Sequence, residues 1–350
     1  MRQPEMRQTE MRQAEVRQAE VRQAEVRQAE VRQAEVRQGD MADGLKETAA
    51  TPRHFVWHGE MGDEMCAAFA EDGYLIIEDF FAADQCDALK AHAIGLMDNH
   101  QADEDLVVFS AAGQAHAKAD YFRTSGDKIR FFLEEGAVDE AGQLRVPMRE
   151  AVNKIGHNLH DLDSEFSAFS RAPQMRKVAE KLFTAPQLLQ SMYICKNAHI
   201  GGEVNCHQDS TFLYTKPESC IGFWVAIEDA TPENGCLYAE TGGHHGPLRA
   251  LFQGGQENGF QDKGGELAMR TLDTTPFGEA DAALIARKGT LVLLHGRVPH
   301  LSSANMSDKS RHAYALHVID GSAHYPAENW LQRGADHPLR GFETEGLTGG

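Results

Sequence analysis

The spacing of hydrophobic residues divides the chain into a mainly helical first part and a strand-rich second part. Apolar residues recur at three- and four-residue intervals, as on one face of a helix, at residues 62–73, 82–100, 147–162 and 174–183. Short runs rich in aromatic and β-branched residues, typical of strands, follow at residues 190–197, 211–215, 220–229, 236–240, 289–296 and 311–320. Helices followed by many short strands predict an α+β protein whose core is a β-sandwich or jelly roll.

The first forty residues have no such pattern. They consist of eight tandem pentapeptides, from MRQPE to VRQGD. Five residues advance about 500° around a helix, so the repeated Met and Val positions never line one face. We therefore expect residues 1–40 to be a low-complexity tail and residues 41–350 to form one domain, because no linker interrupts them. Met41 opens the second region, which favours a non-functional extension over an interaction tail.

Charge and cysteine content exclude several classes of function. The formal net charge is −19, and the tail contributes nothing to it because its eight Arg balance seven Glu and one Asp. Such an acidic domain is a poor nucleic-acid binder, since neutralising phosphates requires Lys and Arg. No apolar run approaches the roughly 20 residues that cross a membrane. Six cysteines without a C-x-x-C pair indicate reduced thiols, hence the cytoplasm. Nothing in the sequence points to a protein partner.

Candidate metal ligands appear in the segment HQD. His207 and Asp209 are two residues apart, so in a strand they would point to the same face. His300, which follows an apolar strand and a Pro-containing turn, is the best third ligand. Arg311 begins an alternating strand that would reach the same site if it paired beside residues 289–296. Two His and one carboxylate suit a non-haem Fe(II) oxygenase, and a buried Arg suits a dicarboxylate cosubstrate.

Four segments, in order, resemble the phytanoyl-CoA dioxygenase family: HQDSTFLYT, GFWVAIEDATPENGCLY, HGRVPHLSSANMSDKSR and PAENWLQ. The resemblance covers residues from about 53 to about 335 and implies a double-stranded β-helix, a jelly-roll relative, flanked by N-terminal helices. It also implies a hydroxylase that uses Fe(II), 2-oxoglutarate and O₂, releases succinate and CO₂, and is assayed with ascorbate as reductant.

The same resemblance assigns roles to individual residues. It implies that His207, Asp209 and His300 hold the iron. It implies that Arg311 and Ser302 hold the far carboxylate of 2-oxoglutarate. It further implies that the cosubstrate pocket is lined by Lys154, Met192 and Trp224.

The primary substrate is not implied in the same way. Residues 239–244 (AETGGH) replace the Pro-Gly-Ser-His turn that is usual in relatives. An acyl-CoA ester would need local basic groups in an acidic domain, and the one candidate cluster comprises Lys118, Arg123, Lys128 and Arg130. We therefore expect a small-molecule or acyl substrate, without a commitment to CoA.

Each assignment has an ordinary alternative. Arg311 alone would fit a surface pair with Asp308. Trp224 and Met192 would fit core packing, and Lys154 would fit a solvated position on the helix expected at residues 147–162.

Alternatives also exist for the whole chain. His244 and His245 suggest a second metal, but two adjacent His in a Gly-rich turn are more often exposed. The domain could be a non-catalytic jelly-roll binding protein with a decayed site, which turnover of 2-oxoglutarate would exclude. It could also be a zinc hydrolase with the same ligands, although the sequence has no H-E-x-x-H spacing.

Overall fold

The computed structural model describes residues 50–100, 107–108, 121–139, 143–254 and 267–343. The pentapeptide repeat, Lys118 and nearly all of a surface loop expected at residues 254–265 lie outside these ranges. The α-helices are α2 (Asp63–Asp72), α3 (Ala83–Asp98), α5 (Met148–Ala151), α6 (Leu159–Leu162), α7 (Ser164–Ser170) and α8 (Pro173–Leu182). Short 3₁₀ helices are η1 (Glu135–Ala137), η2 (Asp209–Thr211), η3 (Pro232–Asn234) and η4 (Gly243–His245).

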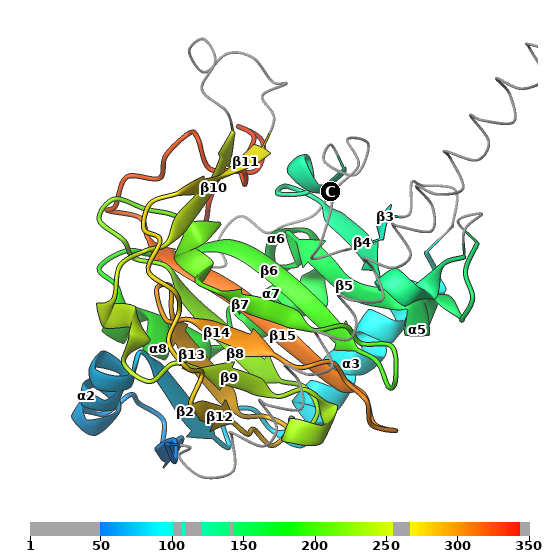
Figure 1. Cartoon of the computed structure of the whole chain (residues 1–350), viewed down its shortest axis with the longest axis horizontal. Helices are drawn as coiled ribbons and strands as arrows, with labels where there is room; N and C mark the ends of the chain where they lie inside the picture. Colours follow the sequence, from blue (N-terminus) through cyan, green and yellow to red (C-terminus); the bar gives the residue numbers. More distant parts are fainter. Residues whose placement is uncertain (1–49, 101–106, 109–120, 140–142, 255–266, 344–350) are drawn as a thin grey trace, which may run out of the picture. The chain divides into compact units, whose positions relative to one another are not determined.

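The strands of the described residues form two large sheets and one hairpin (Figure 1). The nine-stranded sheet has the order β1 (His54–Val56), β2 (Tyr74–Glu78), β13 (Leu291–His295), β8 (Ile221–Ala226), β15 (Arg311–Asp320), β6 (Pro186–Lys196), β5 (Val152–His157), β4 (Ile129–Leu133) and β3 (Val107–Val108). The four-stranded sheet has the order β12 (Ala282–Leu284), β9 (Leu237–Ala239), β14 (His300–Ser302) and β7 (Val204–His207). The hairpin pairs β10 (Ala250–Gly254) with β11 (Leu267–Thr271). The two large sheets face each other as a sandwich, which confirms the α+β jelly-roll expectation.

Strand β15 shows why the nine-stranded sheet is buried on both faces. Nine of its ten residues are buried, including the polar Arg311, His312 and His317. Tyr314 and Leu316 point to one face and join the main hydrophobic core. Arg311 and His317, at odd positions, point to the other face, toward the four-stranded sheet. The inner face of the sandwich therefore carries the polar side chains.

Helices cover the outer face of the nine-stranded sheet. The core on that side includes Met65 from α2, Leu89 from α3, Phe166 from α7 and Met175 from α8. Helix α8 illustrates the pattern: Pro173 starts it, and its buried residues Met175, Val178 and Ala179 are three and four positions apart. The predictions of helices at residues 62–73, 82–100 and 174–183 are confirmed.

The prediction of one helix over residues 147–162 is wrong. Only α5 and α6 are helical, and β5 lies between them. Ile155 pairs with Phe131 of β4 and with Tyr193 of β6, and all three side chains are buried. Pairing on both sides outweighs the local helical spacing, and Gly156 weakens a helix at this point. Lys154 consequently lies on a strand and faces the inside of the sandwich.

The prediction of a strand over residues 211–215 is also wrong. The chain turns there, because the backbone N–H groups of Phe212 and Leu213 both donate to the carbonyl of Asp209. Leu213 is 2% exposed and packs in a small second core with Trp330 and Leu331. The apolar residues of this segment therefore fill a core rather than build a sheet.

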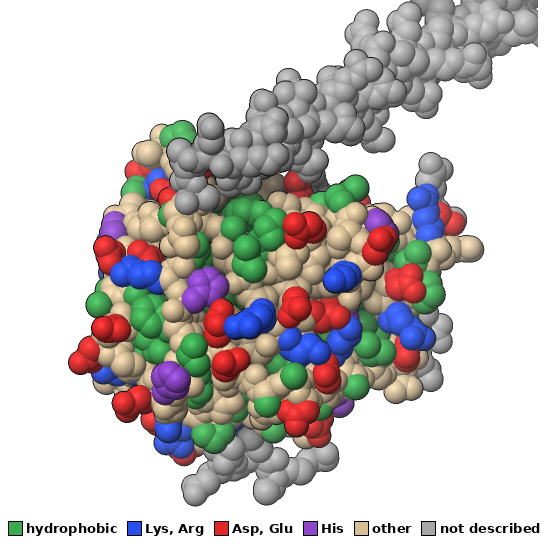
Figure 2. Space-filling model, turned by 90° about the horizontal axis from the view of Figure 1, so that it is seen from below, with side chains coloured by type: hydrophobic (Ala, Val, Ile, Leu, Met, Phe, Trp, Pro, Cys, Tyr) green, Lys and Arg blue, Asp and Glu red, His purple; other side chains and the backbone are tan. Residues whose placement is uncertain are grey.

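The surface agrees with the acidic composition. On the face in Figure 2, Lys and Arg side chains are interspersed with Asp and Glu, and the described residues form no continuous basic patch there. Within the described ranges, no helix is long and apolar enough to cross a membrane.

Candidate metal centre and cosubstrate pocket

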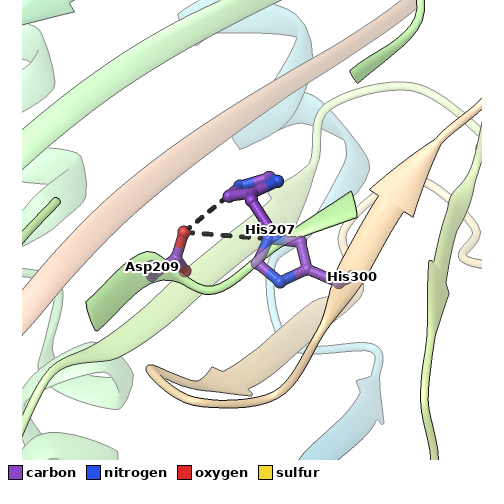
Figure 3. Close-up of side chains that lie close together, drawn as sticks. All are labelled: His207, Asp209 and His300. Carbon is purple, nitrogen blue, oxygen red and sulfur yellow. Dashed lines mark ion pairs between the residues drawn. The ribbon is translucent and has the colours of Figure 1, made fainter. Parts of the chain in front are cut away.

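Three side chains from neighbouring segments converge at one end of the four-stranded sheet (Figure 3). His207 ends β7, and His300, which begins β14, is its direct partner across the two strands. Asp209 begins η2, two residues after His207. Oδ1 of Asp209 lies 3.5 Å from Nε2 of His207 and 3.7 Å from Nε2 of His300. One ligand atom from each residue lies within 4.8 Å of the others, and this is the single such group in the described residues.

Both imidazoles are held with Nε2 directed at this point. Nδ1 of His207 donates to the carbonyl of Asn205 at 2.8 Å, and Nδ1 of His300 donates to the carbonyl of Val298 at 3.1 Å. A ring that donates from Nδ1 keeps its lone pair on Nε2. Two such nitrogens and one carboxylate oxygen fit a divalent transition metal and leave further coordination positions open.

The second oxygen of Asp209 is held by a residue that sequence reasoning did not assign. Nε2 of His317 lies 3.2 Å from Oδ2 of Asp209. Gly222 is the cross-strand partner of His317, and a Cβ at Gly222 would lie 3.1 Å from Oδ2 of Asp209. The absence of a side chain at Gly222 therefore makes room for the contact. Arg311 and His317 are six residues apart on one strand, and this even spacing was the signal available in the sequence.

The electrostatics keep Asp209 ionised and His300 neutral, which are the forms that bind a metal. Burial alone would raise the pKa of Asp209, but His317, His300 and His207 together hold that pKa well below its usual range. Burial, and then His207, lowers the pKa of His300 to about 4. Burial would also lower the pKa of His207, but its contact with Asp209 outweighs burial and raises it. At neutral pH the site thus offers an ionised carboxylate and at least one neutral imidazole.

A buried cationic group lies further along the inner face. Arg311 is 2% exposed, so it is no surface residue, and Asp308 pairs with His199 instead. Burial lowers the pKa of Arg311 to about 10, so the guanidinium stays charged at neutral pH. Its Nε donates to the carbonyl of Gly235 at 3.1 Å, and its Nη1 is buried and has no hydrogen-bond partner among the residues that the structure describes.

The Trp224 ring borders this guanidinium, and Ser302 lies on β14 of the four-stranded sheet. Cζ of Arg311 lies 5.4 Å from the centre of the Trp224 ring. The hydroxyl of Ser302 is buried, and none of the described residues forms a hydrogen bond with it. A Cβ at Gly235 would lie 2.6 Å from the carbonyl oxygen of Ser303, so the backbone that holds Arg311 touches the residue after Ser302.

Lys196 is a second cation that sequence reasoning missed. It is the cross-strand partner of Arg311. Burial, and then Arg311, lowers its pKa to about 7. Its ammonium donates to the carbonyls of Gly202 and Ser303 at 2.6 and 2.8 Å, and these contacts hold the strand end beside Arg311.

The other two expected pocket residues, Met192 on β6 and Lys154 on β5, lie on the inner face of the nine-stranded sheet. Met192 is the partner of Gly156 in β5 and of Ala315 in β15. Lys154 faces the same side, with its ammonium 5.4 Å from the centre of the Phe132 ring. Lys154 is half-buried and lies on a strand rather than on the expected helix, and burial lowers its pKa to about 8.

Three expectations about the surroundings need correction. Strand β7 ends at His207, so the ligands converge from a strand end and a turn rather than from one strand face. Strand β8 separates β15 from β13, so these two are not neighbours. His245 is exposed as expected, but His244 is 6% exposed and its Nε2 donates to the carbonyl of Ala70.

The expected basic cluster is also only partly described. Lys128 is exposed and pairs with Asp127 at 2.7 Å. Arg130 donates to the Thr124 hydroxyl and stacks on Tyr121. These contacts engage both cations in local structure.

Comparison with known proteins agrees with this geometry. Residues 69–313 match the sequence profile of the family described as phytanoyl-CoA dioxygenase (PhyH). The chain is 40% identical over 288 residues to mouse (Mus musculus) phytanoyl-CoA dioxygenase domain-containing protein 1, covering 77% of this chain and 94% of that protein. It is 37% identical over 281 residues to an Arabidopsis thaliana phytanoyl-CoA dioxygenase, covering 79% and 95%.

Solved structures share the fold at low sequence identity. The non-heme alpha ketoglutarate dependent carbocyclase SnoK from nogalamycin biosynthesis superposes with a TM-score of 0.51 at 18% identity, over 79% of this chain and 96% of that one. EctD from S. alaskensis, solved with 2-oxoglutarate and 5-hydroxyectoine, gives 0.51 at 18% identity, over 76% and 78%. With the facial triad in place, the sequence matches establish that this chain belongs to the phytanoyl-CoA dioxygenase family of Fe(II)- and 2-oxoglutarate-dependent oxygenases.

Proposed function

We propose that the protein hydroxylates a small-molecule substrate. One oxygen atom of O₂ enters the new hydroxyl group, and the other enters succinate as 2-oxoglutarate loses CO₂. The observation that carries this proposal is the convergence of His207, Asp209 and His300, whose ligand atoms lie within 4.8 Å of one another. Bound Fe(II) supplies the activation of O₂. The carboxylate at Asp209 favours hydroxylation over halogenation, because it leaves no ligand position vacant for halide.

The protein's own residues have three tasks in this reaction. His207 and His300 present Nε2 to the metal, because their Nδ1 atoms are tied to backbone carbonyls. Asp209 presents Oδ1, because Oδ2 faces His317. Fixed ligands of this kind raise metal affinity and keep the open positions on one side.

The second task is to bind 2-oxoglutarate. In our assignment Arg311 and Ser302 bind the far carboxylate, since Nη1 of Arg311 and the Ser302 hydroxyl are buried without partners. A buried donor left unpaired costs about 1–3 kcal/mol, and a carboxylate would satisfy both. We assign Trp224, Met192 and Lys154 to the walls of the same pocket, because Trp224 lies beside the Arg311 guanidinium and the charge of Lys154 acts on the metal ligand His207.

The third task is to keep water out. Apart from half-buried His207, the metal ligands and Arg311 are at most 7% exposed. In such surroundings charge-assisted hydrogen bonds are stronger than in water, which favours tight binding of a dianionic cosubstrate.

The test combines metal analysis with turnover. The purified protein should bind one Fe(II) and convert 2-oxoglutarate to succinate in the presence of O₂ and ascorbate. Asp209→Ala and His300→Ala should each abolish succinate formation while keeping the melting temperature close to that of the parent. A protein that retains zinc and shows no turnover with Fe(II) would contradict the proposal, as would normal iron affinity in both variants. The cytoplasmic location stays a prediction that fractionation of cells would check.

A further inference from the structure

A group of buried polar atoms beside the metal centre has no hydrogen-bond partner in the described part of the chain. These atoms are Nε2 of His157, Nδ1 of His317, Nε1 of Trp330, and Nε and Nη1 of Arg333. His157, His317 and Trp330 are 1%, 5% and 4% exposed. Buried polar groups are normally paired, and each unpaired one costs about 1–3 kcal/mol. Nε1 of Trp330 and the two nitrogens of Arg333 can only donate, and we therefore call the four residues the donor cluster. Nε2 of His157 is an acceptor, because Nδ1 of the same ring donates to the Ser125 hydroxyl.

The members of the donor cluster come from separate segments and meet at His157. The rings of His157 and Trp330 meet edge to face with centroids 5.2 Å apart. His157 and His317 lie on either side of β6, opposite Ser191 and Gln190, and Arg333 donates to the carbonyl of Leu189 on the same strand. Strand β5, strand β15 and the segment after β15 therefore converge on one region.

This region adjoins the metal centre through His317. His317 contacts Oδ2 of Asp209 with Nε2, at 3.2 Å, and its unpaired Nδ1 is on the same ring. A molecule that binds the donor cluster through His317 would thus be one imidazole ring away from a metal ligand.

Aromatic rings connect the same two places along a second route, which we call the aromatic wall. Phe122 stacks on Trp330 with ring centroids 4.4 Å apart. Successive centroids are then 6.3 Å apart for Phe122 and Phe252, 5.6 Å for Phe252 and Phe212, and 6.1 Å for Phe212 and the metal ligand His207. Such a surface suits an apolar carbon body.

The chemistry of the donor cluster specifies the sign of its ligand. An indole N–H and a guanidinium can only donate hydrogen bonds. Arg333 uses Nη2 on the carbonyl of Leu189, at 2.8 Å, and still has two unpaired nitrogens. A guanidinium is also a permanent cation. The missing partner therefore supplies acceptor oxygens and negative charge.

We propose that the substrate is an organic acid whose anionic group, a carboxylate or a phosphate monoester, binds the donor cluster while its apolar body lies against the aromatic wall. This inference rests on the proposed hydroxylase function. This binding mode places the anionic group of the substrate close to the substrate carbon that is oxidised. A CoA thioester does not meet that condition, because the thioester is neutral and the phosphates lie beyond the pantetheine arm.

The test uses the enzyme loaded with Fe(II) and 2-oxoglutarate without oxygen. Calorimetric titrations would compare straight-chain and phenyl-substituted carboxylic acids with their primary amides, their CoA thioesters and the phosphate monoesters of the matching alcohols. Losing one charge-assisted hydrogen bond, about 1.5–3 kcal/mol, corresponds to about 10- to 150-fold in affinity. We expect at least one acid or phosphate to bind about 10-fold or more tightly than its amide, and the two anionic series identify the group.

Two variants tie that affinity to the donor cluster. Trp330→Phe keeps a ring against Phe122 but removes the N–H, and Arg333→Gln removes the charge. Each should weaken binding of the best acid by about 10-fold or more and leave 2-oxoglutarate binding unchanged. Arg287→Gln is the control, because Arg287 is an exposed residue that pairs with Glu78.

Three results would overturn the inference: amides or CoA thioesters that bind as tightly as the acids, an enzyme that binds 2-oxoglutarate but no acid, or variants that bind acids normally. An enzyme that fails to bind 2-oxoglutarate would instead contradict the proposed function, so the two failures are distinguishable.

Discussion

Replacing Arg311 by Lys separates charge from geometry at the cosubstrate pocket. The guanidinium has a fixed planar fork: Nε is engaged by the carbonyl of Gly235 at 3.1 Å, while Nη1 is buried and unpaired. A lysine ammonium has the same charge but places its donors at one point. In Arg311→Lys the ammonium cannot reach both the Gly235 carbonyl and the far carboxylate of 2-oxoglutarate with the original geometry.

The expected loss follows from one charge-assisted hydrogen bond. Such a bond contributes about 1.5–3 kcal/mol, which corresponds to a 2-oxoglutarate affinity about 10- to 150-fold weaker. The effect should be near the upper end of this range, because Arg311 is 2% exposed and water cannot replace the lost donor. An exposed ion pair would contribute under about 1 kcal/mol. Iron affinity should stay close to that of the parent, because Arg311 is not a ligand.

The assay is an anaerobic titration of 2-oxoglutarate into the Fe(II) protein, followed by the metal-to-ligand absorption band. Metal content is measured on the same samples. Arg287→Lys serves as the matched control, because that arginine pairs with Glu78 at the surface. A binding curve for Arg311→Lys that superimposes on those of the parent and the control would refute the assignment of Arg311 to the pocket.

Three further predictions concern other parts of the chain. His317→Gln should weaken Fe(II) binding about 10- to 100-fold, as loss of a partner of a ligating carboxylate typically does. His312→Gln is the control and should leave Fe(II) binding unchanged, because His312 is on the opposite face of β15 with its Nδ1 at the Tyr193 hydroxyl. Equal iron affinities in the two variants would argue against the role of His317. Because burial lowers the pKa of Lys154 to about 8, its ammonium is present below that pH and lost above it. The affinity for 2-oxoglutarate should therefore fall as pH rises through about 8 in the parent but not in a Lys154→Arg variant. The same pH profile in both proteins would contradict this prediction. Deleting residues 1–40 should leave the melting temperature and succinate formation unchanged, and a large loss of either would show that the repeat is structural.

Much of the centre was predictable because its signals are local. His207 and Asp209 are two residues apart, and His300 follows an apolar strand, so three ligand types could be read from short segments. Arg311 at the start of an alternating strand was similarly visible. The metal ligands are defined by the identities of these side chains more than by the exact backbone conformation. The prediction of the three ligands therefore holds, although they lie at a strand end and a turn rather than on one strand face.

Features that depend on long-range pairing were less accessible. Residues 152–157 have helical spacing, but partners in β4 and β6 make them a strand. The contact of His317 with Asp209 requires Gly222 on the neighbouring strand, and no single segment carries that information. The buried donors of Trp330 and Arg333 become noticeable only when the structure shows that they have no partners.

The two halves of the centre are built on parts of the sheets with different connectivity. Arg311 begins β15, which has a strand on each side and both faces covered, whereas His207 ends β7, the last strand of the four-stranded sheet. Amide exchange is slowest where backbone hydrogen bonds are buried on all sides and fastest at edges. The cosubstrate pocket is therefore expected to stay formed in the metal-free protein, while the segment from β7 to η2 opens and closes. We therefore expect the site to form in a fixed order, in which metal binding completes a site whose cosubstrate pocket is already formed.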